Sequence, residues 1–176
     1  MRILEIRRHT MRQSSGTHLT QAGVDLARRV GNELGQFDRV ITSTLPRAFE
    51  TAIAMGYAVD EQIEQLGMMN DAVTAVIPWN AGYTAWLKAA QNNPVVARYT
   101  QAMADLLRSI VRALPENGSA LIISHGGIVE AGTIGCLPAG TYFADDAACG
   151  YCEGARLTFD GDAAINLEML RADQPR

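Results

Sequence analysis

Short apolar runs, each followed by a helical pattern, restrict the fold of this sequence more than any other feature. Three of them have the length and residue types of buried strands, and they span residues 3–6, 37–42 and 119–124. Helix signals follow, because Thr20 is a good N-cap and Pro46 stands near the first position of a helix. Strands that alternate with helices form layered domains. We therefore expect a three-layer α/β/α sandwich around a mostly parallel central sheet.

Other segments complete the predicted fold. An apolar stripe at helical spacing predicts a helix over residues 95–114, and another helix is expected from about Ile128. Residues 156–159 and 165–170 are predicted to pair as a closing β-hairpin. Residues 56–95 are less regular, and we expect them to form a lid or a side wall.

The composition is that of an ordinary globular protein. With 176 residues, of which 48% are hydrophobic and 19% charged, and no linker-like stretch, the chain is predicted to form a single domain over residues 1–176. The net charge of −4 argues against a general role in binding nucleic acid or membrane surfaces. No apolar run approaches the roughly 20 residues that cross a bilayer, and no signal-peptide pattern is present, so we expect a cytoplasmic protein.

The three cysteines do not form a recognisable set. Cys149 and Cys152 have a CxxC spacing, but no second pair completes a zinc site, and Cys136 stands apart. We interpret all three as reduced, partly buried cysteines. Use in metal binding or redox chemistry is the less favoured alternative.

Cationic or titratable side chains follow each predicted strand. Arg8 and His9 end the first, Arg47 lies in the first turn of the helix after the second, and His125 ends the third. In open α/β sheets ligands bind at this edge, and the planar fork of Arg matches the oxygens of phosphate or carboxylate. One pocket that collects these side chains would bind a phosphoryl group. A solvated basic turn is the alternative for the first stretch taken by itself.

Two glycines directly after His125 fit an anion site as well. Gly126 and Gly127 allow a tight turn, and they leave amide groups accessible at the start of the next helix. We therefore include Gly126 among the expected substrate-binding residues.

Four short motifs, spread over residues 3–132, occur in an order and at a spacing that match a known family. They are Arg8-His9-Thr10, Leu19-Thr20-x-x-Gly23, Ser43-x-Leu45-x-Arg47-Ala48-x-x-Thr51-Ala52 and Ser124-His125-Gly126-Gly127. Together they resemble the histidine phosphatase superfamily, which has the phosphoglycerate-mutase-like fold. The resemblance implies a sheet flanked by helices and a reaction that passes through a phosphorylated histidine.

The resemblance also implies roles for single residues. His9 is the implied nucleophile, and a neutral imidazole nitrogen is competent for that step. Arg8 and Arg47 would hold the non-bridging oxygens of the phosphoryl group, with His125 as a further donor. Neither a metal nor another cofactor is required. Thr10 stands where the family most often has Gly, and its hydroxyl is expected to donate to phosphate or to pack.

The general acid is the weakest part of the match. The family often places a carboxylate in a Leu-x-Glu segment before a Gly, and the nearest equivalent here is Glu64, one residue short of the commonest spacing. Glu61 and Asp71 are the next candidates. If none of them reaches the pocket, turnover is slow or the leaving group must be intrinsically good.

Several other side chains have structural interpretations. Arg7 should point away from Arg8 and form an ion pair, and Glu130 is expected to be solvated or paired with an Arg. Arg12 would add charge at the pocket mouth or be an ordinary loop residue. Three aromatic residues would form either a substrate wall or a satellite core, namely Trp79, Tyr83 and Trp86.

The sequence thus predicts a phosphatase that hydrolyses phosphate monoesters or phosphoprotein groups through a phosphohistidine on His9. Its expected partner is a phosphorylated small molecule or a phosphoprotein, and the sequence specifies no oligomeric state. A phosphoglycerate-type mutase is one alternative, although 176 residues leave little room for the segments that enclose its substrate. A phosphate-binding scaffold protein with weak or lost catalysis is the other.

Overall fold

The computed structural model describes residues 1–138, 140–141, 143 and 145–173. Within these residues one sheet contains six strands in the order β3-β2-β4-β1-β5-β6. The bounds of the strands are β1 (Arg2–Arg8), β2 (Arg39–Thr42), β3 (Glu61–Gln62), β4 (Ser119–Ser124), β5 (Gly154–Asp160) and β6 (Ala163–Leu170). The three strands expected from the apolar runs are β1, β2 and β4, and they are the neighbours at the centre of the sheet.

The sheet is mostly parallel, as predicted. β4 pairs in parallel with β1 and with β2, and β2 pairs in parallel with the short edge strand β3. The predicted hairpin is β5 and β6, which run antiparallel to their neighbours and turn at Gly161 with a φ of 58°. Positive φ is easily adopted by glycine, which explains the residue type at this turn.

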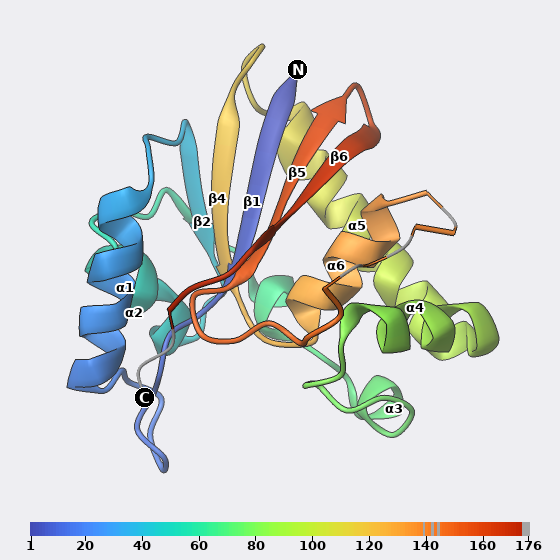
Figure 1. The fold of residues 1–176 in the computed structure, drawn as a ribbon, viewed down its shortest axis with the longest axis horizontal. Coiled ribbons are helices and arrows are strands. Elements are labelled where there is room, and N and C mark those ends of the chain that lie inside the picture. The colour runs from blue at the N-terminus through green and yellow to red at the C-terminus, as the bar shows by residue number, and fades with distance from the viewer. Residues whose placement is uncertain (139, 142, 144, 174–176) are drawn as a thin grey trace.

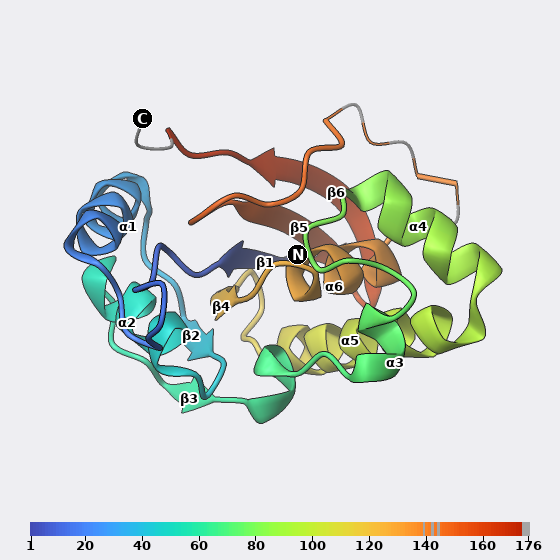
Figure 2. The same cartoon turned by 90° about the horizontal axis from the view of Figure 1, so that it is seen from below.

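Helices cover both faces of the sheet, which confirms the three-layer arrangement (Figure 1). One face carries α1 (Gln21–Glu33) and α2 (Pro46–Ala54), and Figure 2 shows this pair separated by the sheet from the other helices. The second face carries α5 (Pro94–Arg112) and α6 (Ile128–Cys136), and α4 (Tyr83–Asn92) packs against these two helices.

The alternation of side chains along β4 divides the core in two. Leu121 and Ile123 belong to the cluster under α1 and α2, whereas Ala120 and Ile122 belong to the larger cluster under α4, α5 and α6. All four side chains have no exposed area. A strand that is apolar on both faces is expected at the centre of a sheet covered on both sides.

Residues 56–95 form the side wall expected from the sequence. After β3 the chain forms a 3₁₀ turn, η1 (Glu64–Gly67), and a one-turn helix, α3 (Asp71–Thr74), before it reaches α4. Tyr83 and Trp86 are completely buried in the larger core cluster, so they form core rather than a substrate wall.

The structure also bears on two predictions made from composition, the state of the cysteines and the absence of a membrane span among the described residues. Cys136, Cys149 and Cys152 are free thiols, and they are buried more completely than expected. Within the described part of the chain, none of the helices combines the length and the apolar character of a membrane span.

Candidate active site

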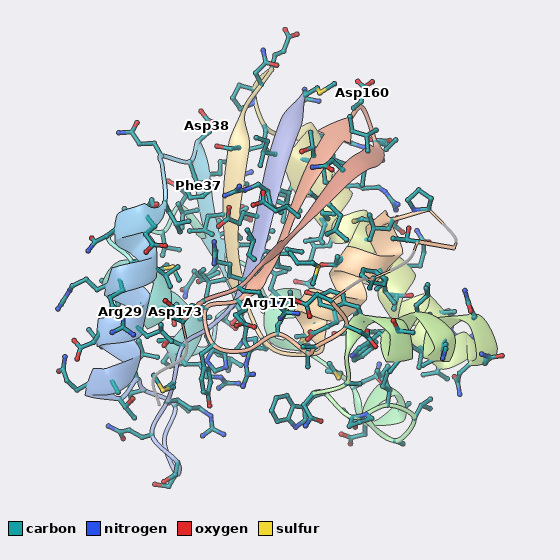
Figure 3. All side chains as sticks on the ribbon, in the orientation of Figure 1. Arg29, Phe37, Asp38, Asp160, Arg171 and Asp173 are labelled. Carbon is teal, nitrogen blue, oxygen red and sulfur yellow. The ribbon has the colours of Figure 1, made fainter. Side chains whose placement is uncertain are left out.

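The carboxyl ends of β1, β2 and β4 meet at one edge of the sheet. Figure 3 places Asp38, which precedes β2, and Asp160, at the end of β5, at the opposite edge. At the carboxyl edge a cavity of about 420 Å³ is lined by all four of the predicted cationic or titratable residues of the phosphate pocket, which are Arg8, His9, Arg47 and His125. The fold therefore brings together side chains that are up to 117 positions apart in sequence.

His9 lines the cavity, and its two ring nitrogens have different hydrogen-bond partners. Arg47 Nε lies 3.1 Å from His9 Nε2, and because a guanidinium group can only donate, Nε2 must accept. The ring proton is then on Nδ1, which donates to the Thr10 carbonyl at 2.6 Å. Burial, and to a smaller extent the nearby charges of Arg47, Arg8 and Arg12, lower the pKa of His9 to about 3, although the hydrogen bond to the Thr10 carbonyl opposes this shift. His9 is therefore neutral at physiological pH, as a nucleophile must be.

His125 lies beside His9, with a ring-centroid separation of 5.0 Å. Its Nε2 is 2.7 Å from Ser43 Oγ, and its buried Nδ1 has no hydrogen-bond partner among the described residues. The Leu45 amide donates to Ser43 Oγ, and the Ser43 hydroxyl can donate to Nε2, an arrangement that places the ring proton on the unpaired Nδ1. Burial and then the nearby His9 lower the pKa of His125 to about 2. The ring thus offers one neutral donor.

Arg8 is held by a carbonyl and by two aromatic rings. Its Nη1 donates to the Cys149 carbonyl at 2.9 Å, and its guanidinium carbon lies 5.1 Å from the Trp79 ring centroid and 4.4 Å from that of Tyr151. Its Nε is buried without a hydrogen-bond partner among the described residues. Buried donors are normally paired, so the unpaired nitrogens of Arg8 and His125 are suited to an anionic ligand with several acceptor oxygens.

The charge of the cavity also favours an anionic ligand. Arg12 also lines it, and the Arg12 side chain is fixed there by donating to the carbonyls of Gln13, Ser14 and Gly16. Of the two roles expected for Arg12, the structure has the one at the pocket mouth. Among the described residues no Asp or Glu lines this cavity. Three guanidinium groups without a nearby carboxylate favour a dianion.

The three acid candidates lie outside the cavity lining. Glu64 is exposed in the first turn of η1, Glu61 pairs with Arg39, and Asp71 is exposed at the start of α3. From the same segment Leu66 points into the core, while Gly67 and Met69 reach the cavity. A role for Glu64 in catalysis stays a prediction that needs movement of this side wall.

Thr10 does not bind substrate in this arrangement, contrary to one of the two expectations. Its side chain is completely buried, and its hydroxyl donates to the Gly23 carbonyl at 3.0 Å. The Thr10 amide donates to Thr51 Oγ1 at 3.1 Å. Thr10 therefore ties the end of β1 to α1 and α2, which is the packing alternative.

Two expectations are wrong, namely that the Gly127 amide is accessible to an anion and that Glu130 is solvated or paired with an Arg. Glu130 is completely buried rather than solvated, because its two oxygens accept from the amides of Gly127 at 2.7 Å and Cys149 at 2.8 Å. The Gly127 amide is thus occupied and not available to an anion. Gly126 does line the cavity. Arg7 behaves as predicted, since its Nε donates to Glu5 at 2.5 Å on the far side of the strand.

Sequence reasoning assigned no role to two residues that shape the site, Tyr151 and Ser43, and of the three candidates for a substrate wall only Trp79 is one. Tyr151 lies in an irregular loop before β5, and nothing in its sequence context marks it. Ser43 belongs to one of the four motifs, which could have singled the residue out, but the sequence does not show what its side chain contacts. Trp79 lines the cavity, unlike Tyr83 and Trp86. Among the described residues no group of three or more His, Cys, Asp or Glu side chains could hold a metal ion.

Comparisons with known proteins agree with this geometry. A family model described as the histidine phosphatase superfamily (branch 1) matches residues 5–170. The phosphoserine phosphatase of Entamoeba histolytica, in complex with 3-phosphoglyceric acid, has a TM-score of 0.70 at 18% identity, with 98% of each chain covered. A mycobacterial glucosyl-3-phosphoglycerate phosphatase in complex with VO3 has a TM-score of 0.66 at 19% identity, covering 98% of this chain and 100% of that one.

A third solved structure is that of the protein histidine phosphatase SixA complexed with tungstate. Its TM-score is 0.56 at 20% identity, and the match covers 95% of this chain and 93% of that one. At these identities the likeness is one of fold. None of the curated proteins matches the chain significantly.

Proposed function

The chain belongs to the histidine phosphatase superfamily, and we propose that it is a phosphatase that hydrolyses phosphate monoesters or phosphoprotein groups through a phosphohistidine on His9. The observation that carries this proposal is the Arg47 Nε contact with His9 Nε2. It marks Nε2 as the unprotonated ring nitrogen, whose lone pair becomes available for attack once Arg47 donates to a phosphoryl oxygen instead.

In the first step, His9 Nε2 attacks phosphorus and the bond from phosphorus to the leaving oxygen or nitrogen breaks. Arg8, Arg47 and His125 Nδ1 donate to the non-bridging oxygens, so the charge that builds up meets donors already in place. The hydrogen bond from Nδ1 to the Thr10 carbonyl orients the ring and stabilises the positive charge that it acquires.

In the second step, water attacks the phosphohistidine and the nitrogen–phosphorus bond breaks, which releases inorganic phosphate and neutral His9. The leaving group of the first step takes its proton from solvent or from Glu64, Glu61 or Asp71. Because these carboxylates lie outside the cavity lining, a substrate with a good leaving group is favoured.

A phosphate-binding scaffold remains the second candidate, because no described carboxylate lines the cavity. The substrate is proposed only as a class, a phosphorylated small molecule or a phosphoprotein. A phosphoglycerate-type mutase and the cytoplasmic location stay predictions of the sequence.

The deciding experiment is hydrolysis of p-nitrophenyl phosphate with chelator present, together with trapping of the phosphoenzyme. Wild type should turn over and yield an acid-labile, base-stable phosphoryl label, and His9→Ala should abolish both. His18→Ala is the matched control, because His18 is an exposed histidine that pairs with Glu50 away from the cavity lining. Binding of vanadate without His9-dependent turnover would instead identify the scaffold.

A further inference from the structure

Trp79 is a large aromatic side chain that lines the cavity while 51% exposed. Its ring is held in place by close packing on the start of α6, since a Cβ atom added to Gly126 would lie 3.1 Å from Trp79 Cε3. Trp86, by contrast, is completely buried in the core. Trp79 therefore lines the cavity and keeps about half of its surface uncovered by the described residues.

The position of Trp79 relative to the phosphoryl site follows from Arg8. The guanidinium carbon of Arg8 lies 5.1 Å from the Trp79 ring centroid, and the Nε of the same group is buried without a hydrogen-bond partner among the described residues. A phosphoryl group bound to Arg8 would therefore lie near the indole ring, which its substituent can reach within the same cavity. This step rests on the proposed function, because it assumes that Arg8 binds the phosphoryl group.

The remaining lining limits what that substituent can be. Met69 and Ile128 are apolar, and no described carboxylate lines the cavity to pair with an ammonium group. A free phosphorylated amino acid would bring its ammonium group among three guanidinium groups, which repel it. An adjoining cavity of about 460 Å³ shares Gly67 and Met69 with the first, and it continues the apolar lining with Met68 and Met103.

Leaving-group chemistry restricts the substituent in the same direction. A phenol or an imidazole departs more readily than an alcohol, because the negative charge or the electron pair left behind is better stabilised on the ring. A phenol or imidazole leaving group therefore depends less on a general acid than an alcohol leaving group does. We propose that the cavity selects phosphoryl groups carried on a planar aromatic ring, with Trp79 as the stacking surface that recognises the ring.

Binding of non-hydrolysable phosphonates tests the proposal without any influence of leaving-group reactivity. Phenylphosphonate and cyclohexylphosphonate carry the same charged group and rings of six carbons, but only the first ring is planar and aromatic. Stacking on Trp79 should make phenylphosphonate bind about 2- to 10-fold more tightly to wild type, as judged by competition against p-nitrophenyl phosphate.

Three variants complete the test. Trp79→Leu keeps apolar bulk and should remove the preference for the phenyl ring, whereas Trp79→Phe should retain it. Ile53→Ala alters an exposed apolar side chain on α2, outside the cavity lining, and should keep the wild-type preference. Equal binding of the two phosphonates to wild type, or a preference that survives in Trp79→Leu, would overturn the proposal.

Methylphosphonate separates this proposal from the function on which it rests. If methylphosphonate competes and turnover depends on His9, the phosphoryl site stands, and only the ring preference is at stake. If no phosphonate competes and His9→Ala changes nothing, the proposed function fails first. Peptides carrying phosphotyrosine or phosphohistidine, each compared with phosphoserine in the same sequence, then identify the ring, and a preference for phosphoserine would contradict selection of rings.

Discussion

Glu130 and Gly127 are joined at the start of α6 by a hydrogen bond of 2.7 Å, in which the Gly127 amide donates to Glu130 Oε2. The other carboxylate oxygen accepts from the Cys149 amide at 2.8 Å, and the Cys149 carbonyl in turn accepts from Arg8. One buried carboxylate therefore fixes the turn after His125 to the loop that holds Arg8. This arrangement makes Glu130 a positioning residue of the site.

Replacing Glu130 should weaken the fold and substrate binding together. Glu130→Ala leaves two buried amides unpaired, which should cost about 2–4 kcal/mol of unfolding free energy in urea titration. In Glu130→Gln one oxygen can still accept, so we expect a smaller loss of stability and a raised KM with a smaller change in kcat. Glu116→Gln, in an exposed turn, is the control that should leave both measurements unchanged. A Glu130→Gln enzyme with wild-type KM would contradict the positioning role.

Removing the Ser43 hydroxyl should disturb catalysis through His125. Ser43 Oγ lies 2.7 Å from His125 Nε2, so it sets the orientation of the ring and the position of its proton. In Ser43→Ala the ring is free to expose the wrong nitrogen, and we expect kcat to fall about 10-fold or more, within the range of a lost donor. Stopped assays of kcat and KM, with the exposed Ser109→Ala as control, check this. Equal rates for the two variants would show that Ser43 does not orient His125.

Gly127 is needed for two physical reasons, which a pair of variants can separate. It has a φ of 80°, and a Cβ atom there would lie 2.4 Å from Met69 Cε and 3.0 Å from the Trp79 carbonyl oxygen. Gly56 has a φ of 97° but no atom within 4 Å of its added Cβ, so Gly56→Ala should cost only the strain of about 1–2 kcal/mol. Gly127→Ala should cost about 1–3 kcal/mol more, from overpacking. If Gly127→Ala and Gly56→Ala lose equal free energy of unfolding, measured with heat or urea, a steric contribution at Gly127 is excluded.

The two buried histidines should make the protein less stable in acid. Their pKa values are about 3 for His9 and about 2 for His125, against 6.5 for an ordinary histidine. Below about pH 6.5 the unfolded chain binds protons that the folded protein does not, so the free energy of unfolding falls as the pH drops from about 6.5 toward 3. Above about pH 6.5 both histidines are neutral in the folded and the unfolded chain, so this loss of unfolding free energy is absent. The loss approaches about 1.4 kcal/mol per pH unit for each histidine.

A series of urea titrations between pH 7 and 4 measures this slope. His9→Asn removes one of the two titrating rings, so the stability of that variant should fall less steeply with acid than that of wild type. A variant slope identical to the wild-type slope would show that His9 is not held neutral by the fold.

Sequence alone determined the central strands, the parallel arrangement and the cationic side chains at the strand ends. Each of these depends on local periodicity, and the carboxyl ends of parallel neighbours meet at one edge whatever the details of packing. Arg8, His9, Arg47 and His125 could therefore be predicted to share a pocket, and they line one cavity.

Tertiary structure decided the roles that depend on what packs against a side chain. Glu130 is buried because the loop before β5 returns over α6, and the Thr10 hydroxyl faces Gly23 because α1 packs against the end of β1. Tertiary packing also separates three aromatic residues of one irregular segment, leaving Trp79 at the cavity and placing Tyr83 and Trp86 in the core. Pairings between residues distant in the chain are set by the closing of the fold, and the pattern of neighbouring residues does not contain them.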